Sequence, residues 1–398
     1  MTNPITDIRE TPKRRFAILS SCPEAWGGSE ELWGGTALRL AKAGHEVHVF
    51  KTLVDDRHPS VNALREAGVV VWDHYRLPVP RRNYYVRRLP GRWKNGRLAP
   101  HIEWIMAYIR GLRPDLMVVS QGENFDGLEY TELCRRVGFP YVIICQKASD
   151  LNWPTDQSRD QMRHAYRDSV RNYFVSRHNR ELTEMQIGTG LENAEVVANP
   201  CMTTARAPLP WPESDSEVVR GACVGRLFAL EKGQDILLRV LARPKWQERP
   251  LEISFFGKGI HSAALREAAE YLGLKNVRFA GFTTNVTDVW RTHHFLVLPS
   301  RAEGLPLSVI EAMVCGRPAI VTRVGGNADV IEDGVTGFLS SGIDPDGLDE
   351  TMERAWACRH RWERIGCAAA NSVRSWLPED PCSDFKEKLL KIAAGSHK

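Results

Sequence analysis

Two glutamates flank the start of a short apolar stretch in the segment SRAEGLPLSVIEAMVCGRP, which runs from Ser300 to Pro318. Glu303 precedes the apolar stretch, and Glu311 follows eight positions later within it. Because proline suits the first turn of a helix and not its interior, Pro306 predicts a helix that begins near Pro306 or Leu307. The two carboxylates are therefore expected on the loop before a helix and on the helix itself.

The start of this helix is a candidate binding site for a phosphate. Gly304 lets the backbone come close to a ligand. The N–H groups of Leu305, Leu307 and Ser308 would point at that ligand, with the positive helix end behind them. Carboxylates are poor phosphate ligands, but they accept hydrogen bonds from the hydroxyls of a sugar or a ribose. Taken alone, each glutamate is explained at least as well as an acid favoured by the helix dipole.

A second candidate lies in the segment VGRLFALEKG, from Val224 to Gly233, where two cations stand six positions apart after an apolar run. On a loop between a strand and a helix, Arg226 and Lys232 can both reach a diphosphate. A solvated surface loop would carry the same pair, so that alternative stays open for these residues alone.

A third candidate is the Gly27-Gly28 pair in the segment PEAWGGSEELW, between an expected strand and an expected helix. Two glycines there allow backbone amides to approach a phosphate, with the N-terminus of the helix pointing at it. A tight connection without a ligand explains the same pair.

Taken together, these segments resemble the GT-B glycosyltransferases, and specifically the retaining nucleotide-sugar enzymes of family GT4. The resemblance rests on Glu303 and Glu311 as an E-x7-E pair, on the loop Arg226–Gly233 and on the Gly-Gly loop in WGGSEELW. It is strong over Ala222–Leu339 and loose over the first part of the chain. The fold it implies is α/β, with two Rossmann-like domains facing across a cleft and the donor held mainly by the C-terminal one.

The resemblance implies a retaining transfer of a sugar from a nucleotide-diphosphate sugar to an acceptor hydroxyl, in glycan, glycolipid or glycoconjugate biosynthesis. It implies catalytic roles for Glu303, Arg226 and Lys232, with the two cations on the diphosphate. These cations would stabilise the charge that develops on the leaving phosphate, and that phosphate would help to take the acceptor proton on the front face of the sugar. Neither a cofactor nor a metal ion is then expected.

The resemblance also implies a larger set of donor contacts. Glu303 would contact sugar hydroxyls, and Glu311 would contact the ribose. The implied donor-binding residues are Gly27, Gly28, Arg226, Lys232, Glu303, Gly304, Leu305, Pro306, Leu307 and Glu311.

One position departs from the pattern of the family. Many relatives carry a histidine at the end of a strand of the N-terminal domain, beside the reacting sugar. In the segment YVIICQKASD this position holds Gln146, followed by Lys147. Gln146 can hydrogen-bond a sugar hydroxyl but cannot become charged. Gln146 and Lys147 are therefore candidates for contact with the sugar or the acceptor, with Lys147 as a partial substitute for the missing charge.

The elements that position these residues alternate between short β-branched runs and helical patterns, which is typical of parallel sheets buried on both faces. The expected strands are Phe16–Ser21, His45–Phe50, Val69–Trp72, Asp115–Ser120, Tyr141–Gln146, Asn172–Arg177, Ala194–Asn199, Gly221–Leu227, Leu251–Gly257, Val277–Phe282, His294–Ser300, Pro318–Val324 and Gly337–Ser341. Doubly wound sheets bind their ligands at the carboxyl ends of the strands, and the candidate residues lie at the ends of expected strands or shortly after them.

The stretch between Asn199 and Glu217 carries four prolines and no regular pattern, which indicates a linker. We therefore expect an acceptor-binding domain over residues 1–200, with 1–14 disordered, and a linker over 201–216. A donor-binding domain is expected over 217–376. Residues 377–398 should hold a last helix, about Ser383 to Ile392, which the resemblance places back on the N-terminal domain.

The composition limits the classes of function. A chain of 398 residues with 43% hydrophobic and 26% charged residues is typical of a soluble globular protein with two or three domains. A net charge of +4 is small for this length, so no nucleic-acid partner is expected. Nine cysteines without metal-site spacing, no apolar leader and no apolar run long enough to span a bilayer favour a cytoplasmic location.

The segment Arg81–Arg97 holds seven basic residues, three aromatic residues and no acid. Such a segment fits a peripheral contact with an anionic membrane surface, or a contact with a phosphate-bearing acceptor. A solvated loop beside an acceptor site explains it at least as well. The acceptor itself, whether a carbohydrate, a glycolipid or a small molecule, leaves no signature in the sequence.

Other classes of enzyme use the same kind of sheet. A nicotinamide or flavin oxidoreductase would need G-x-G-x-x-G directly after a first strand, and the segment SSCPEAWGGSEE lacks that spacing. An epimerase or hydrolase of nucleotide sugars stays open as an alternative. A non-catalytic nucleotide-sugar sensor also stays open, because Gln146 stands in the histidine position.

Overall fold

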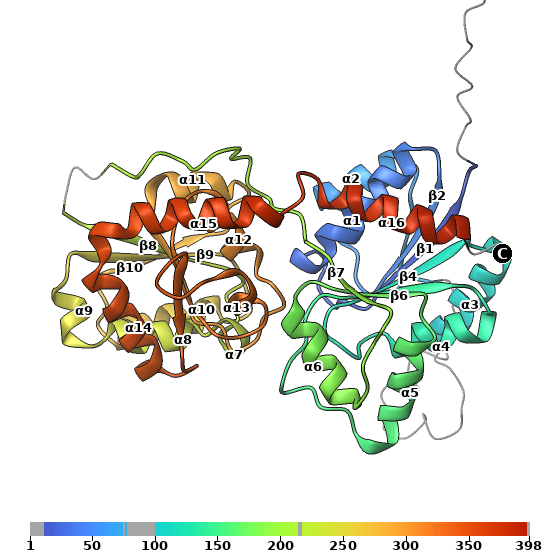
Figure 1. The fold of residues 1–398 in the computed structure, drawn as a ribbon, viewed down its shortest axis with the longest axis horizontal. Helices are drawn as coiled ribbons and strands as arrows, with labels where there is room; N and C mark the ends of the chain where they lie inside the picture. Colours follow the sequence, from blue (N-terminus) through green and yellow to red (C-terminus); the bar gives the residue numbers. More distant parts are fainter. Residues whose placement is uncertain (1–11, 75, 78–99, 214–216, 396–398) are drawn as a thin grey trace, which may run out of the picture. The chain divides into compact units, whose positions relative to one another are not determined.

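The computed structural model describes residues 12–74, 76–77, 100–213 and 217–395, which form two open β-sheets with helices on both faces (Figure 1). The strand order is β3-β2-β1-β4-β5-β6-β7 in the first sheet and β10-β9-β8-β11-β12-β13 in the second. Neighbouring strands such as β1 and β2, or β8 and β9, run parallel. In each sheet the order reverses beside the first strand in the chain, which is the doubly wound, Rossmann-like arrangement.

The first sheet and its helices comprise β1 (Arg15–Ser20), α1 (Gly28–Lys42), β2 (Glu46–Lys51), α2 (Pro59–Glu66), β3 (Val70–Asp73), α3 (Pro100–Leu112), β4 (Leu116–Gln121), α4 (Leu128–Val137), β5 (Tyr141–Cys145), α5 (Asp156–Arg167), β6 (Arg171–Phe174), α6 (Arg177–Ile187), β7 (Ala194–Val196) and α16 (Pro381–Gly395).

The second sheet and its helices comprise β8 (Val219–Val224), α7 (Ala229–Lys232), α8 (Gln234–Leu241), α9 (Pro244–Glu248), β9 (Leu251–Phe256), α10 (Ser262–Tyr271), β10 (Val277–Gly281), α11 (Val286–Thr292), β11 (Phe295–Leu298), α12 (Leu307–Val314), β12 (Ala319–Thr322), α13 (Asn327–Val330), β13 (Gly337–Ser340), α14 (Pro345–Ala357), the 3-10 turn η4 (Arg359–Arg361) and α15 (Trp362–Trp376).

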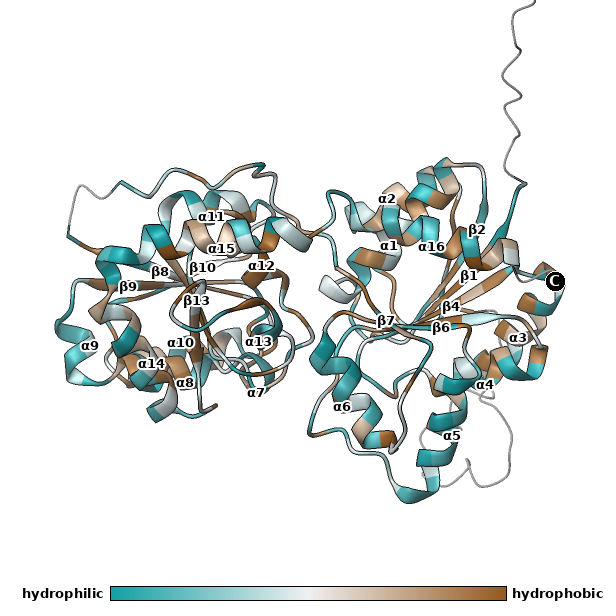
Figure 2. Ribbon diagram, in the orientation of Figure 1, coloured by the Kyte–Doolittle hydropathy of each residue, from teal (hydrophilic) through white to brown (hydrophobic). Residues whose placement is uncertain are grey.

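The expected strands are all present, and the sequence explains why. The central strands are continuous apolar runs, such as YVIIC in β5 and FLVL in β11, and every residue in both is buried. Burial on both faces is what covering helices impose on a parallel sheet. Figure 2 shows the resulting hydrophobic strands at the centre of each unit, with hydrophilic helix faces outside. Gly44 (φ +88) and Gly68 (φ +86) end the first two helices in the left-handed region that favours glycine.

The chain forms two compact units, and their limits differ from the predicted boundary at residue 200. The first unit contains the described residues up to Ile144, then Asp160–Asn172 and the residues from Cys382 onward. The second contains Cys145–Arg159 and Tyr173–Pro381. The segment after β5, the end of β6, α6 and β7 thus belong to the second unit, although β5, β6 and β7 are strands of the first sheet.

The last helix, α16, packs on α1 within the first unit. A Cβ atom on Gly35 would lie only 2.5 Å from the sulfur of Cys382, so the glycine permits the close approach of the two helices. The hydroxyl of Thr36 donates to the carbonyl of Cys382 at 3.2 Å, and Arg39 donates to the hydroxyl of Ser383 at 3.2 Å.

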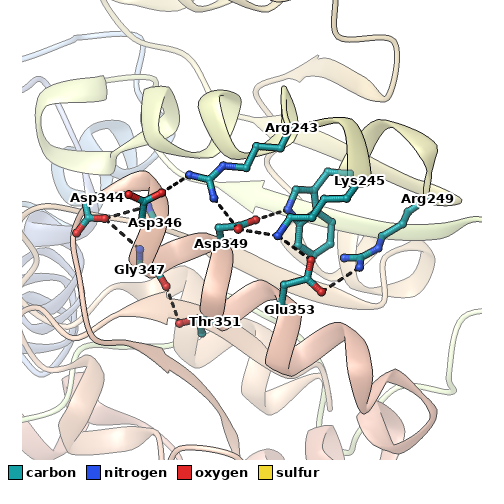
Figure 3. A network of polar contacts seen from close by, with 10 residues as sticks. Arg243, Lys245, Arg249, Asp344, Asp346, Gly347, Asp349, Thr351 and Glu353 are labelled. Carbon is teal, nitrogen blue, oxygen red and sulfur yellow. Dashed lines mark hydrogen bonds and ion pairs between the residues drawn. The ribbon is translucent and has the colours of Figure 1, made fainter.

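In the second unit, α8, α10 and α14 cover one face of the sheet, and α11, α12 and α15 cover the other (Figure 1). A network of ion pairs ties the segment around α9 to α14 (Figure 3). Asp349 accepts hydrogen bonds from Arg243 at 2.6 Å, from Lys245 at 2.7 Å and from the indole of Trp246 at 2.6 Å. Glu353, one turn further along α14, accepts from Arg249 at 2.9 Å.

Candidate active site

The predicted residues of the second unit gather at the carboxyl ends of β8 and β11. The chain leaves β8 through Gly225 and Arg226, forms the short helix α7 and turns at Gly233. Gly233 has φ +64, and a Cβ atom there would lie 1.9 Å from the carbonyl oxygen of Pro299. This glycine therefore lets the loop after β8 press directly against the loop after β11.

Lys232 and Glu303 form an ion pair across these two loops. The ammonium of Lys232 lies 2.6 Å and 2.7 Å from the two carboxylate oxygens of Glu303. The hydroxyl of Ser300 donates to the same carboxylate at 2.6 Å. Glu303 is 5% exposed, so its charge depends on Lys232 for compensation.

Glu231 links two further cations. Its carboxylate accepts a hydrogen bond from Lys147 at 2.8 Å and another from Arg226 at 2.9 Å. Burial acts to raise the pKa of Glu231, but the hydrogen bond from Lys147 and the charges of Lys147, Arg226 and Lys232 outweigh it. The pKa therefore lies below the ordinary value for glutamate, and Glu231 is an anion at neutral pH. Three cations and two carboxylates thus meet in one cluster.

Two side chains that the sequence analysis did not single out hold these loops in place. The guanidinium of Arg301 donates to both oxygens of Asp235 at 2.7 Å and 2.8 Å, and to the carbonyl of Ala229 at 2.7 Å. Gln234, which is fully buried, donates its amide N–H to the carbonyl of Arg226 at 2.7 Å. The only signal in the sequence was their position, because Gln234 directly follows the segment Val224–Gly233 and Arg301 lies in the segment Ser300–Pro318.

The loop after β11 leads into α12 as predicted. This helix begins at Leu307, with Pro306 (φ −65, ψ 125) in the capping position. Leu305 is half-buried and packs against the core of the second unit. The backbone amides at the start of α12 therefore follow Glu303 and Gly304 within a few residues, which is the geometry of an anion-binding helix terminus.

Close backbone packing surrounds this loop. A Cβ atom on Gly304 would lie 1.9 Å from the carbonyl oxygen of Gln146. A Cβ atom on Gly325 (φ +53) would lie 2.2 Å from the carbonyl oxygen of Glu303. The N–H of Gly326 donates to the carbonyl of Gly304 at 2.6 Å. The glycines of the VGGN segment after β12 were not predicted as part of the site, and they fix the path of its central loop.

Glu311 has different surroundings from Glu303. It lies in the second turn of α12 and is 6% exposed. Burial raises the pKa of the Cys201 thiol to about 12, and the negative charge of Glu311 is the second cause. Glu311 therefore lies near Cys201. Gln146 is also buried, and its side-chain carbonyl accepts a hydrogen bond from Asn199 at 2.9 Å.

Gly27 and Gly28 lie in the first unit, at the start of α1. Gly27 is in extended conformation (φ −156), and its N–H donates to Glu30 at 3.0 Å. The ammonium of Lys51 donates to the other carboxylate oxygen of Glu30 at 3.0 Å and to the carbonyl of Cys22 at 3.2 Å. A buried ion pair therefore supports the glycine turn, with Glu30 and Lys51 exposed by only 0% and 1%.

The structure also bears on the predicted surface features. The basic segment Arg81–Arg97 lies outside the described residues. No helix in the described part of the chain has the length and apolar character that crossing a bilayer requires. Among the same residues, no three or more His, Cys, Asp or Glu side chains are grouped so that they could hold a metal ion.

The cluster in the second unit is suited to a ligand that carries both phosphates and hydroxyls. Arg226, Lys232 and the start of α12 supply positive charge and N–H donors, which suit phosphate oxygens. Glu303 supplies a buried acceptor, which suits a hydroxyl group.

Comparisons with known proteins agree with this chemistry. The family model described as "Glycosyltransferase Family 4" matches residues 26–203, and the model described as "Glycosyl transferases group 1" matches residues 219–357. Glycogen synthase of Pseudomonas fluorescens is 28% identical over 345 residues, covering 76% of this chain and 69% of that protein.

The GDP-mannose-dependent alpha-(1-6)-phosphatidylinositol monomannoside mannosyltransferase of Mycolicibacterium smegmatis is 25% identical over 61% of this chain and 68% of its own length. Several other curated relatives are matched over only 35% to 42% of their length. The crystal structure of Anabaena Alr3699/HepE in complex with UDP has a TM-score of 0.72 at 16% identity, covering 96% of this chain and 99% of that one. The same protein has also been solved with UDP-glucose.

Proposed function

Because the chain belongs to the group 1 glycosyl transferases of family 4 and has the GT-B fold, we propose that it transfers a sugar from a nucleotide-diphosphate sugar to an acceptor hydroxyl with retention of configuration. The observation that carries this proposal is the hydrogen-bonded pair of Lys232 and Glu303 beside the start of α12. It combines a cation for a phosphate with a buried acceptor for a hydroxyl.

In this proposal Arg226 and Lys232 bind the diphosphate, and the backbone amides after Gly304 bind its oxygens. As the bond to the anomeric carbon breaks, that carbon becomes cationic and the leaving phosphate oxygen gains negative charge. Arg226 and Lys232 stabilise the second charge, and loss of one such preorganised group costs on the order of 100- to 1000-fold in rate. The acceptor oxygen then forms a bond to the anomeric carbon on the same face of the sugar, and the leaving phosphate accepts the proton of that hydroxyl.

The remaining predicted residues have supporting roles. Glu303 accepts hydrogen bonds from hydroxyls of the transferred sugar, and Glu311 accepts from the ribose. Gly27 and Gly28 stay proposed donor-binding residues, because two glycines at a helix start allow backbone amides to approach a phosphate. No metal ion takes part, so EDTA should leave the rate unchanged. The similar proteins include one solved with UDP and with UDP-glucose and a GDP-mannose-dependent mannosyltransferase, which supports a uracil or guanine nucleotide as donor.

The test is release of nucleoside diphosphate from UDP-glucose, GDP-mannose and ADP-glucose, with and without a pool of sugar, lipid and inositol acceptors. Transfer predicts that one diphosphate is released only when an acceptor is present, and that Lys232→Ala abolishes the release. Lys275→Ala, an exposed lysine outside the site, is the matched control and should keep the wild-type rate. Release without any acceptor would instead indicate a hydrolase, and binding without turnover would indicate a sensor.

A further inference from the structure

The hydroxyl of Ser300 is a fixed hydrogen-bond donor to the carboxylate of Glu303. Its oxygen lies 2.6 Å from the Oε1 of Glu303. The carbonyl of Ser300 accepts from the hydroxyl of Thr322 at 2.5 Å, and the carbonyl of Thr322 accepts from the side-chain amide of Asn327 at 2.9 Å. Ser300, Thr322 and Asn327 are all 0% exposed. These hydrogen bonds therefore hold the donor to Glu303 from within the core, where a ligand does not reach the side chain of Ser300.

Lys232 holds the same carboxylate in a different way. Its ammonium lies 2.6 Å and 2.7 Å from the two oxygens of Glu303, at the end of a flexible side chain that is 17% exposed. In the proposed function this ammonium also binds the diphosphate of the donor. A diphosphate carries more negative charge than one carboxylate, so it competes with Glu303 for the N–H groups of Lys232. The hold of Lys232 on Glu303 is thus weakest when the donor is bound, which is when Glu303 has to be aligned with the sugar.

Glu303 needs a second donor in that state. It is 5% exposed, and a buried carboxylate that loses part of its cation is costly unless other groups hydrogen-bond to it. Among the residues that the structure describes, this carboxylate accepts hydrogen bonds from the side chains of Lys232 and Ser300 alone. Ser300 donates only to Oε1, so Oε2 is left to accept from a hydroxyl once the ammonium has turned to the phosphates.

We propose that Ser300 is a positioning residue for the transfer, which keeps Glu303 in place while the diphosphate of the donor draws Lys232 away. Oε1 of Glu303 then stays on the hydroxyl of Ser300, and Oε2 accepts from a hydroxyl of the transferred sugar. This inference rests on the proposed function and deepens it, because it explains how one lysine can serve the phosphates while the carboxylate stays aligned. Ser300 itself contacts no substrate and acts only through Glu303.

The experiment is a double-mutant cycle on the rate of transfer, with Ser300→Ala, Glu303→Ala and both substitutions together. The donor is UDP-glucose or GDP-mannose, whichever the wild type uses, and single turnovers with excess enzyme keep slow variants measurable. Ser300→Ala should lower the rate at saturating donor about tenfold or more, the value of one hydrogen bond to a charged group. The donor concentration at half-saturation should rise only about twofold, because the contacts to the diphosphate remain.

The double variant separates positioning from a structural role. If Ser300 acts through Glu303, adding Ser300→Ala to Glu303→Ala should lower the rate by no more than about twofold further. Ser340→Ala is the matched control, because Ser340 is also 0% exposed, ends β13 and donates to the carbonyl of Gly342 at 2.8 Å. It should leave the rate and the half-saturation unchanged, whatever its effect on Tm.

The same loss from Ser300→Ala with and without Glu303 would show a structural role and overturn the proposal, as would an unchanged rate of Ser300→Ala. Should Ser300→Ala fail to fold, Ser300→Cys, which keeps only a weak donor, gives the same cycle. If Glu303→Ala has no measurable rate, monodeoxy analogues of the donor replace it. The loss from Ser300→Ala should then vanish for one analogue, and its persistence with every analogue would overturn the proposal.

Failure of this proposal can be told apart from failure of the proposed function. Turnover of no donor by the wild type would overturn the proposed function itself. Turnover by the wild type together with additive losses from Ser300→Ala and Glu303→Ala would overturn only the role of Ser300.

Discussion

The carboxylate of Glu231 bridges Lys147 and Arg226, at 2.8 Å from the ammonium and 2.9 Å from the guanidinium. Glu231 thus pairs with Arg226, which we propose binds the diphosphate of the donor. A diphosphate that binds Arg226 has to compete with this carboxylate. Glu231 was part of a predicted site segment, but its pairing became visible only in the fold.

Replacement of Glu231 by glutamine removes the competing charge and keeps the shape of the side chain. We expect Glu231→Gln to bind UDP or GDP about fivefold more tightly, which is roughly the effect of one unit charge a few ångströms away near water. Calorimetric titration measures the change. Glu252→Gln, which breaks the peripheral pair with Arg278, is the control and should not alter the affinity. Weaker binding by Glu231→Gln would mean that the carboxylate positions Arg226 instead.

The pair of Lys232 and Glu303 should contribute to stability and to catalysis in separable ways. Lys232→Met leaves a carboxylate that is 5% exposed without its cation, which costs on the order of 3 kcal/mol of unfolding free energy. The double variant Lys232→Met/Glu303→Gln should regain most of that loss in urea titrations, because no uncompensated charge is left. Transfer activity should stay abolished in both variants. Recovery of activity together with stability would remove Lys232 from the proposed mechanism.

The buried pair of Glu30 and Lys51 should matter to the glycine turn at the start of α1. Lys51→Met leaves the fully buried Glu30 without its cation, so we expect a loss of about 3–5 kcal/mol in unfolding free energy. Arg65→Met removes one of the two arginines that pair with the exposed Asp56, the other being Arg76, and should change stability little. Equal effects of the two substitutions in denaturant titrations would contradict the role of the buried pair.

The network between α9 and α14 predicts a dependence of stability on pH. Burial acts to raise the pKa of Asp349, but hydrogen bonds from Lys245, Trp246 and Arg243 outweigh it and the pKa is lowered. A depressed folded-state pKa contributes stability that is complete above the unfolded pKa, about 4, and is lost as the pH falls through the folded value.

The Tm of the wild type should therefore fall as the pH is lowered from about 5 to 3, and Asp349→Asn should make this fall shallower. Asp346→Asn is the matched control, because Asp346 joins the same network but is exposed. Parallel Tm curves for the wild type and Asp349→Asn would show that Asp349 does not contribute to the acid sensitivity.

The fold could be predicted from the sequence because its signals are local. Continuous apolar strands such as YVIIC and helix-ending glycines such as Gly44 can be recognised from a few neighbouring residues. Arg226, Lys232 and Glu303 could also be selected, since each lies at or shortly after the end of a predicted strand, at the edge where ligands bind.

The partners of these residues could not be predicted, because they depend on contacts between distant segments. Arg301 reaches Asp235 and Asn199 reaches Gln146 only after the sheets have formed. The limits of the two compact units also depend on such contacts. Membership of Cys145–Arg159 in the second unit depends on packing beyond the end of β5 and not on any local pattern.

Binding of a nucleoside diphosphate by the second unit tests the central claim most directly. Melting temperatures of the wild type and of Lys232→Ala should be measured with UDP, GDP and ADP and with their glucose or mannose conjugates, each at millimolar concentration. Any ligand that binds only the folded state raises Tm. We predict that one nucleotide series raises the Tm of the wild type by several degrees and leaves that of Lys232→Ala unchanged. Equal stabilisation of both proteins, or of neither by any nucleotide, would contradict the account.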